Sequence, residues 1–234
     1  MPDGGSTGIG ASVKRKEDYR FLVGEGNYTD DINRPNQTYT YMLRSSSAHA
    51  KFSIDTSKAS KAKGVVKIFV GTDMEVGSIP CGWQVDSKDG TPMREPAHPP
   101  IAKDKVRYVG EIIAVVIAES LEDAKNAAEL IDVNYDDIPV VIDMQDALDN
   151  SKGLVHDEIE SNVCYDWELG DSEAVDKAIS EAAHITTLDV RNNRLIPNAM
   201  ETRSAIGDYE HATGQYTLYT TSQNPHVIRL LMGA

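Results

Sequence analysis

Residues 215–229 read Gln-Tyr-Thr-Leu-Tyr-Thr-Thr-Ser-Gln-Asn-Pro-His-Val-Ile-Arg, and this stretch decides how the end of the chain folds. Its first half is rich in Tyr and Thr, which favour a β-strand. Pro225 suits the first turn of a helix, and the apolar residues that follow supply one face of that helix. The sequence therefore predicts a strand-to-helix junction that holds Gln223 and Asn224.

An amide side chain at such a junction has two interpretations. It can cap the helix or close the turn, which is the more common role in an arbitrary sequence. It can also face a ligand, because binding residues are frequent in loops that a rigid scaffold positions. The residues around Gln223 do not decide between the two by themselves.

The composition limits the class of protein. The chain has 234 residues, enough for one large or two modest domains. Its 37 acidic residues outnumber 23 basic ones and give a net charge of −14, so a basic face for nucleic acid or an anionic membrane is not expected. Cys81 and Cys164 lack the spacing of a metal site or a disulfide framework. With neither a leader pattern nor a long apolar run, we expect reduced thiols and a cytoplasmic location.

Strands and short helices alternate through the first half of the sequence. Strands are predicted at Tyr39–Arg44 and Val65–Val70, with a short helix at Thr56–Ala62 between them. Residues 74–105 hold five prolines and three glycines, which exclude long regular structure. Such a loop either lines a site or an interface or is disordered, and both alternatives stay open.

A second strand–helix–strand unit follows this loop. Strands are predicted at residues 106–109 and at Ile112–Ala118, and the almost unbroken apolar run of the latter implies burial on both faces. Ser120 begins a helix, with Asp123 where a capping box usually has Glu or Gln. A strand around residues 133–135 completes a unit typical of an α/β core.

The second half is expected to open with a linker at residues 143–162, which are acidic and interrupted by small residues. A helix capped by Asp171 follows, with a buried apolar stripe. Strands are predicted at Ile185–Arg191 and Ser204–Tyr209, on either side of a turn at Arg194–Arg203.

Three motifs near the C-terminus resemble the large subunit of the molybdenum hydroxylases: Asn198-Ala-Met-Glu-Thr-Arg203, Ala205-Ile-Gly-Asp-Tyr209 and Thr221-Ser-Gln-Asn-Pro-His226. That family includes xanthine dehydrogenases, aldehyde oxidases and aerobic carbon monoxide dehydrogenases. The run from Arg15 to Asp31, with its Gly-x-Gly-x-Tyr and Asp-Asp elements, and Val106-Arg-Tyr-Val-Gly-Glu111 resemble earlier parts of the same subunit. The resemblance thus spans nearly the whole chain.

The resemblance implies an α+β fold with defined domains. Residues 1–23 would form an N-terminal arm, residues 24–143 a hammerhead α/β domain, and residues 144–162 a linker. Residues 163–234 would begin the first molybdopterin-binding domain, a mixed sheet with helices.

The resemblance also assigns a role to Gln223, both catalytic and cofactor-binding. In the family, the glutamine of this Ser/Thr-Gln-Asn corner donates a hydrogen bond to the apical oxo group of molybdenum. A neutral amide can do so without titrating. Glu201 is not assigned as the catalytic base, which in the family comes from near the far C-terminus; we expect it to pair locally with Arg203 or Arg194. His226 and His49 are assigned no chemistry.

The implied activity is that of an oxidoreductase. The full enzyme would bind a molybdenum–molybdopterin dinucleotide in its cytosine form. It would oxidise carbon monoxide, an aldehyde or an N-heterocycle with oxygen from water and pass electrons to iron–sulfur and FAD centres. The sequence has neither a Cys cluster nor a dinucleotide glycine fingerprint. The resemblance therefore implies an iron–sulfur small subunit and an FAD-binding medium subunit as partners, in a dimer of heterotrimers.

The chain ends within the predicted helix at residues 225–234, without a cap. We therefore expect an N-terminal fragment that is inactive alone. The alternative is a non-catalytic binding or assembly module of the same fold, in which Gln223 is only a helix cap.

Overall fold

The computed structural model describes residues 8–11, 13–78 and 81–233. The chain divides into two compact units. The larger unit is Asn36–Val190, and the smaller one combines Met1–Pro35 with Arg191–Ala234. Segments from opposite ends of the sequence therefore belong to one unit.

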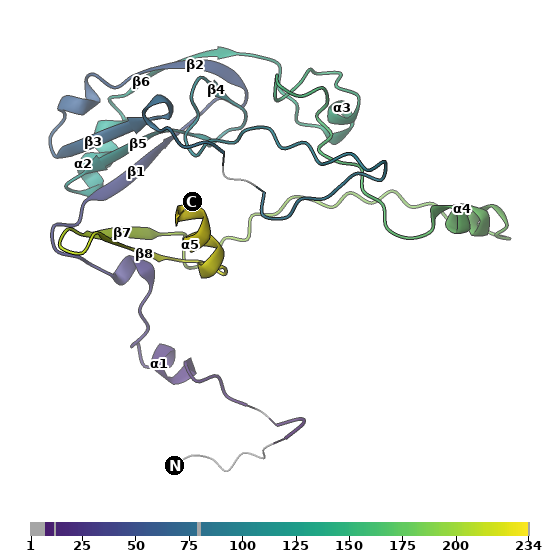
Figure 1. Cartoon of the computed structure of the whole chain (residues 1–234), viewed down its shortest axis with the longest axis horizontal. Coiled ribbons are helices and arrows are strands. Elements are labelled where there is room, and N and C mark those ends of the chain that lie inside the picture. Colours follow the sequence, from purple (N-terminus) through teal and green to yellow (C-terminus); the bar gives the residue numbers. More distant parts are fainter. Residues whose placement is uncertain (1–7, 12, 79–80, 234) are drawn as a thin grey trace. The chain divides into compact units, whose positions relative to one another are not determined.

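The first sheet of the larger unit has three strands in the order β1 (Tyr39–Arg44), β5 (Ile112–Ala118) and β3 (Val65–Val70). Both pairings are antiparallel, and β5 lies in the middle (Figure 1). Ala114, Val116 and Ala118 of β5 belong to one hydrophobic core, whereas Ile113 belongs to a second one. The predicted burial of this strand on both faces is confirmed, and it explains why its sequence is apolar throughout.

Helix α2 (Leu121–Ala128) packs against this sheet. Its buried side chains are all small, and they meet small residues of β5 in the first core: Ala124, Ala127 and Ala128. The predicted N-cap is confirmed, because the Ser120 hydroxyl accepts the Asp123 N–H at 3.0 Å. The Ser120 hydroxyl in turn donates to Asp123 Oδ2 at 2.7 Å, so the shorter Asp side chain binds the hydroxyl and not the cap's backbone.

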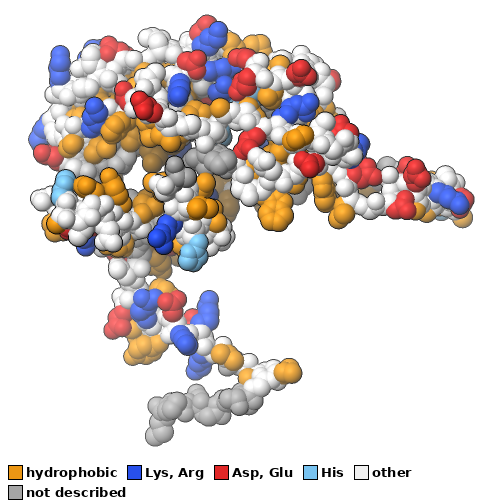
Figure 2. All heavy atoms as spheres, viewed as in Figure 1, with side chains coloured by type: hydrophobic (Ala, Val, Ile, Leu, Met, Phe, Trp, Pro, Cys, Tyr) orange, Lys and Arg blue, Asp and Glu red, His pale blue; other side chains and the backbone are white. Residues whose placement is uncertain are grey.

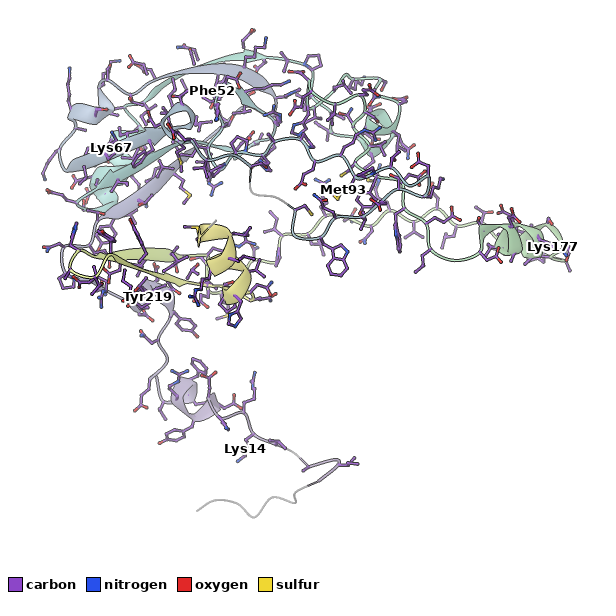
Figure 3. All side chains as sticks on the ribbon, viewed as in Figure 1. Lys14, Phe52, Lys67, Met93, Lys177 and Tyr219 are labelled. Atoms are coloured by element: carbon purple, nitrogen blue, oxygen red, sulfur yellow. The ribbon has the colours of Figure 1, made fainter. Side chains whose placement is uncertain are left out.

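A second antiparallel sheet has the order β4 (Lys105–Val106), β2 (Ala50–Asp55) and β6 (Asp132–Asp137). Phe52 of β2 lies opposite Tyr135 of β6, with ring centres 6.4 Å apart (Figure 3). Strand β2 was not among the predicted strands. This sheet encloses the second core, whose buried members are Ala50, Ala102, Val106 and Ile113.

Two predicted elements are shorter than expected. The strand predicted at residues 106–109 ends after Val106, because the Arg107 N–H donates to Glu111 Oε2 at 2.6 Å. The helix predicted at Thr56–Ala62 is only a 3₁₀ turn, η2 (Ala59–Lys61).

Several short elements were not predicted. They comprise two further 3₁₀ turns, η1 (Thr29–Asp31) and η3 (Gly71–Asp73), and two five-residue helices, α1 (Asp18–Leu22) and α3 (Met144–Leu148). Helix α3 lies within the expected linker, and Asp143 caps it by accepting the Gln145 N–H at 2.8 Å. Residues 143–162, which lie within the larger unit, are therefore partly helical.

The proline-rich loop at residues 74–105 has no helix in its described part, as predicted. It nevertheless pairs with a distant segment of the same unit. The Arg94 N–H donates to the Cys164 carbonyl at 2.9 Å, and the Lys88 N–H donates to the Asp166 carbonyl at 2.7 Å. The described loop is thus held along residues 163–166.

The segment after residue 164 carries exposed apolar side chains, visible in orange along the chain that leads to α4 (Figure 2). Helix α4 (Ser172–Ser180) begins as predicted, with Asp171 accepting the Ala174 N–H at 2.9 Å. Its expected buried stripe is wrong, because none of its residues is buried. The strand predicted at Ile185–Arg191 is also wrong: within the described residues it has no partner strand to complete its backbone hydrogen bonds.

The smaller unit contains an antiparallel hairpin of β7 (Ala205–Glu210) and β8 (Gln215–Thr220), followed by α5 (Pro225–Gly233). Tyr209 and Tyr216 lie opposite each other with ring centres 4.6 Å apart. The α+β class is confirmed. The mixed sheet expected for residues 163–234 is represented here by this one antiparallel hairpin.

Candidate functional site

The strand-to-helix junction between β8 and α5 is present as predicted. The Ser222 hydroxyl accepts the Asn224 N–H at 3.0 Å, and the Asn224 carbonyl accepts the Ile228 N–H at 3.1 Å to open the helix. Pro225 occupies the first helical position, where its missing N–H costs nothing. Ser222 and Asn224 therefore complete the turn without using the side chain between them.

Gln223 is that side chain, and it is exposed. Among the described residues, none forms a hydrogen bond with its amide. A primary amide has two N–H donors and one carbonyl acceptor, and all of them are available to a ligand here. The geometry thus excludes a capping role for Gln223 and leaves its amide free.

The backbone before Gln223 is tied to the segment that precedes β7. The Ser204 carbonyl accepts hydrogen bonds from the Thr220 hydroxyl at 3.2 Å and from the Thr221 N–H at 3.4 Å. The Thr221 hydroxyl donates to Glu201 Oε1 at 3.4 Å. These contacts extend the hairpin by one residue beyond its last ladder pair.

The expected pairing of Glu201 with Arg203 or Arg194 is wrong. No ion pair joins Glu201 to either arginine in the described part of the chain, and the carboxylate accepts the Thr221 hydroxyl instead. The role of Thr221 was not predicted. In the sequence, the hydroxyl of Thr221 within the run Tyr-Thr-Thr-Ser indicates a possible hydrogen-bond donor. It does not indicate which carboxylate accepts that hydrogen bond.

Neither His226 nor His49 belongs to a metal-binding cluster among the described residues. His226 is exposed on α5, whereas His49 is buried and its Nδ1 lies 2.6 Å from the Pro139 carbonyl oxygen. Within residues 8–11, 13–78 and 81–233, no cluster of three or more His, Cys, Asp or Glu could hold a metal ion. The same described residues contain no helix with the length and apolar character needed to cross a bilayer.

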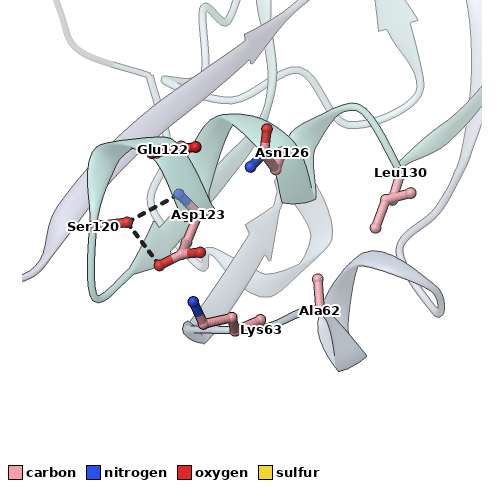
Figure 4. A pocket seen from close by; sticks show the side chains of 7 residues that line it. All are labelled: Ala62, Lys63, Ser120, Glu122, Asp123, Asn126 and Leu130. Carbon is pink, nitrogen blue, oxygen red and sulfur yellow. Dashed lines mark hydrogen bonds between the residues drawn. The ribbon is translucent and has the colours of Figure 1, made fainter.

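A hollow of about 370 Å³ lies in the larger unit, beside the start of α2 (Figure 4). Five of its seven lining residues are polar or charged; the seven are Ala62, Lys63, Ser120, Glu122, Asp123, Asn126 and Leu130. Two of these side chains are already bound to each other, because Ser120 and Asp123 form the cap of α2. This hollow therefore reflects the helix start, and the free amide of Gln223 is the stronger candidate for a binding group.

Two protein families match successive parts of the chain. Residues 23–139 match the "Aldehyde oxidase and xanthine dehydrogenase, a/b hammerhead domain". Residues 155–234, which include Gln223, match the "Molybdopterin cofactor-binding domain". Together the matches account for most of the chain.

Individual relatives match over nearly the full length of the chain. The carbon monoxide dehydrogenase large chain of Afipia carboxidovorans is 30% identical over 96% of this chain and 28% of its own length. The nicotine 6-hydroxylase large subunit of Paenarthrobacter nicotinovorans is 32% identical over 96% of this chain and 27% of its own. The crystal structure of quinoline 2-oxidoreductase from Pseudomonas putida 86 matches with a TM-score of 0.81 and 30% identity, over 94% of this chain and 28% of that one. The chain thus spans little more than a quarter of the length of these relatives.

Proposed function

Since the chain belongs to the aldehyde oxidase and xanthine dehydrogenase family, we propose that it is the N-terminal part of the molybdopterin-binding subunit of a molybdenum hydroxylase. The order of the matches supports this, because the hammerhead match precedes the cofactor-binding match. The observation that carries the proposal is the unpartnered amide of Gln223, exposed at a strand-to-helix junction inside the cofactor-binding match.

The domain division that we propose is the one expected from the sequence. Residues 1–23 form an arm, residues 24–143 the hammerhead domain, residues 144–162 a linker, and residues 163–234 the start of the cofactor domain. The hammerhead match at residues 23–139 and the cofactor-binding match at residues 155–234 support these boundaries to within several residues.

We propose that Gln223 would hold the cofactor, with its amide donating a hydrogen bond to an oxo group of the metal. The residues present fit this role, because the amide is exposed and makes no hydrogen bond with the described part of the chain. When bound, the cofactor supplies oxidation of the substrate with oxygen from water. The amide contributes a neutral donor whose strength does not vary with pH.

The finer features of the enzyme remain part of the proposal. We propose a small substrate, either carbon monoxide, an aldehyde or an N-heterocycle; the names of the relatives, which include carbon monoxide, nicotine and quinoline, support this range. Electrons would pass to an iron–sulfur small subunit and an FAD-binding medium subunit in a dimer of heterotrimers, with the cytosine form of the pterin dinucleotide. A cytoplasmic location agrees with the free thiols of Cys81 and Cys164.

The test uses the complete subunit, produced with its partner subunits. Gln223→Ala should lower kcat or molybdenum content about 10- to 100-fold, the usual effect of removing a group that hydrogen-bonds a metal ligand. His226→Ala is the matched control, because His226 is exposed three residues further along. Wild-type turnover together with wild-type molybdenum content in Gln223→Ala would remove the assignment.

A non-catalytic binding or assembly module is the second candidate. The exposed apolar side chains of the segment before and within α4 favour it, because a partner could cover them: Tyr165, Trp167, Leu169, Val175 and Ile179. Molybdenum analysis of the complete protein separates the two candidates. A protein that folds with its partners and contains no molybdenum would be such a module.

A further inference from the structure

The orientation of Gln223 depends on its backbone. The side chain has no hydrogen bond of its own within the described residues, so the main chain at the junction sets the position from which the amide extends. The β7–β8 ladder ends at the pair Ala205–Thr220, three residues before Gln223. Helix α5 begins two residues after it. A short connection between two regular elements therefore sets where the Gln223 side chain begins.

Thr221 is the residue through which this connection is hydrogen-bonded to the segment before β7. Its N–H donates to the Ser204 carbonyl at 3.4 Å, and its hydroxyl donates to Glu201 Oε1 at 3.4 Å. The neighbouring Thr220 hydroxyl adds a bond of 3.2 Å to the same Ser204 carbonyl. On the helix side, Ser222 closes the turn onto Asn224.

The acceptors come from the segment that precedes β7. Ser204 presents a backbone carbonyl, which any residue would supply, whereas Glu201 presents a carboxylate that reaches across the hairpin end. The Glu201 contact, at 3.4 Å, ends on a side-chain oxygen, whereas the contacts with Ser204 end on a backbone oxygen. Of the hydrogen bonds named here, the contact between Thr221 and Glu201 is the one in which both partners are side chains.

We propose that Thr221 is a positioning residue for Gln223, held by the carboxylate of Glu201. The inference rests on the proposed function, because it assumes that Gln223 meets the cofactor. Losing the contact would let the junction move relative to the hairpin. A displacement near 1 Å of a group that must meet a reacting centre can lower a rate about 100-fold.

The test compares variants of the complete subunit, produced with its partner subunits. Thr221→Val keeps the shape and removes the hydroxyl, and Thr221→Ser restores it. Thr217→Val is the matched control, because Thr217 is exposed on β8, four residues before Thr221, and its hydroxyl has no hydrogen bond in the described structure. Turnover, KM, molybdenum content and amide hydrogen exchange at residues 221–224 are measured for each.

We expect Thr221→Val to lower kcat about tenfold, with KM and molybdenum content unchanged and with faster exchange at residues 221–224. Thr221→Ser and Thr217→Val should behave like the wild-type protein. Equal loss of molybdenum and of turnover in Thr221→Val would indicate a structural role and overturn the inference.

Gln223→Ala separates this inference from the proposed function. If Gln223→Ala is impaired while Thr221→Val retains wild-type kcat and exchange, the positioning role is wrong and the proposed function stands. If Gln223→Ala retains both turnover and molybdenum, the assignment of Gln223 fails, and the positioning role fails with it.

Discussion

Arg34 donates two hydrogen bonds to Asp208 Oδ2, from Nε at 3.0 Å and from Nη2 at 2.7 Å, although 174 positions separate the two residues. The Arg34 guanidinium also lies 5.9 Å from the ring centre of Tyr219, the β8 residue labelled in Figure 3. The hydrogen bonds to Asp208 raise the pKa of Arg34 above its ordinary value. These contacts join the segment before β1 to the β7–β8 hairpin and explain why both chain ends form one unit.

Arg34→Ala should therefore loosen the smaller unit. We expect faster amide hydrogen exchange in residues 29–34 and in both hairpin strands, because the hydrogen bonds and the ring contact are lost together. Arg20→Ala is the control, since the contacts of the Arg20 side chain in the described structure are local, with Glu17 and with the Phe21 ring. Equal exchange in wild type and Arg34→Ala would show that this contact does not hold the unit together.

The junction and the central strand could be predicted because their signals are local. Pro225 fixes its own φ and so marks the first turn of α5. The apolar run at residues 112–118 demands burial on both faces, which the middle of a sheet provides. Ser120 satisfies an N–H only three residues away. Each of these inferences needs only neighbouring residues.

The missed features depend on contacts that the sequence does not display. Residues 185–191 have strand-like composition, yet the described structure gives them no partner strand. Strand β2, in contrast, is present but was not predicted. Ala50, Phe52 and Ile54 alternate as a strand requires, but the run is short and lies in a polar stretch. The contact of Glu201 with Thr221 spans 20 residues, and spacing alone does not rank Thr221 above the nearer arginines.

Ile113 should be the most sensitive position of the second core. Its side chain is 1% exposed and packs among Ala50, Ala102 and Val106. Ile113→Val should lower the free energy of unfolding by about 0.5–1.5 kcal/mol, and Ile113→Ala by about 2–5 kcal/mol, because a cavity remains. Urea unfolding measures both. Val66→Ala, at a residue that is 57% exposed, should change little, and an equal loss there would contradict the core assignment.

Ser120→Ala should destabilise α2 through its cap. The change removes the hydroxyl that accepts the Asp123 N–H and leaves that donor without its partner. The expected loss is about 0.5–2 kcal/mol of unfolding free energy. Ser120→Thr keeps a hydroxyl and should therefore retain most of the stability that the cap provides. Helix-specific hydrogen exchange at residues 121–124 provides the measurement. Equal protection in Ser120→Ala and Ser120→Thr would show that the cap contributes nothing.

The pair of Lys105 and Asp157 should make the larger unit sensitive to acid. The Lys105 side chain is 7% exposed, and its ammonium lies 3.1 and 3.0 Å from the two carboxylate oxygens of Asp157. The hydrogen bond from Lys105 holds the pKa of Asp157 below its ordinary value. The contribution of this pair to stability is therefore complete above pH about 4, the ordinary aspartate pKa, and is lost as the pH falls through the lower folded pKa.

Asp157→Asn isolates that contribution. At neutral pH it should cost about 1–2 kcal/mol of unfolding free energy, less than the 3–5 kcal/mol typical of breaking a fully buried pair, because the Asp157 side chain is 73% exposed. Between pH 5 and pH 3, the free energy of unfolding should fall less in this variant than in the wild-type protein. The difference should be about the contribution of one carboxylate, because the variant lacks the titrating group. In Lys105→Met/Asp157→Asn the buried charge disappears as well, so part of the neutral-pH stability should return. Denaturant unfolding across this pH range measures all three proteins. Parallel pH profiles for wild type and Asp157→Asn would show that the ion pair does not contribute to acid sensitivity.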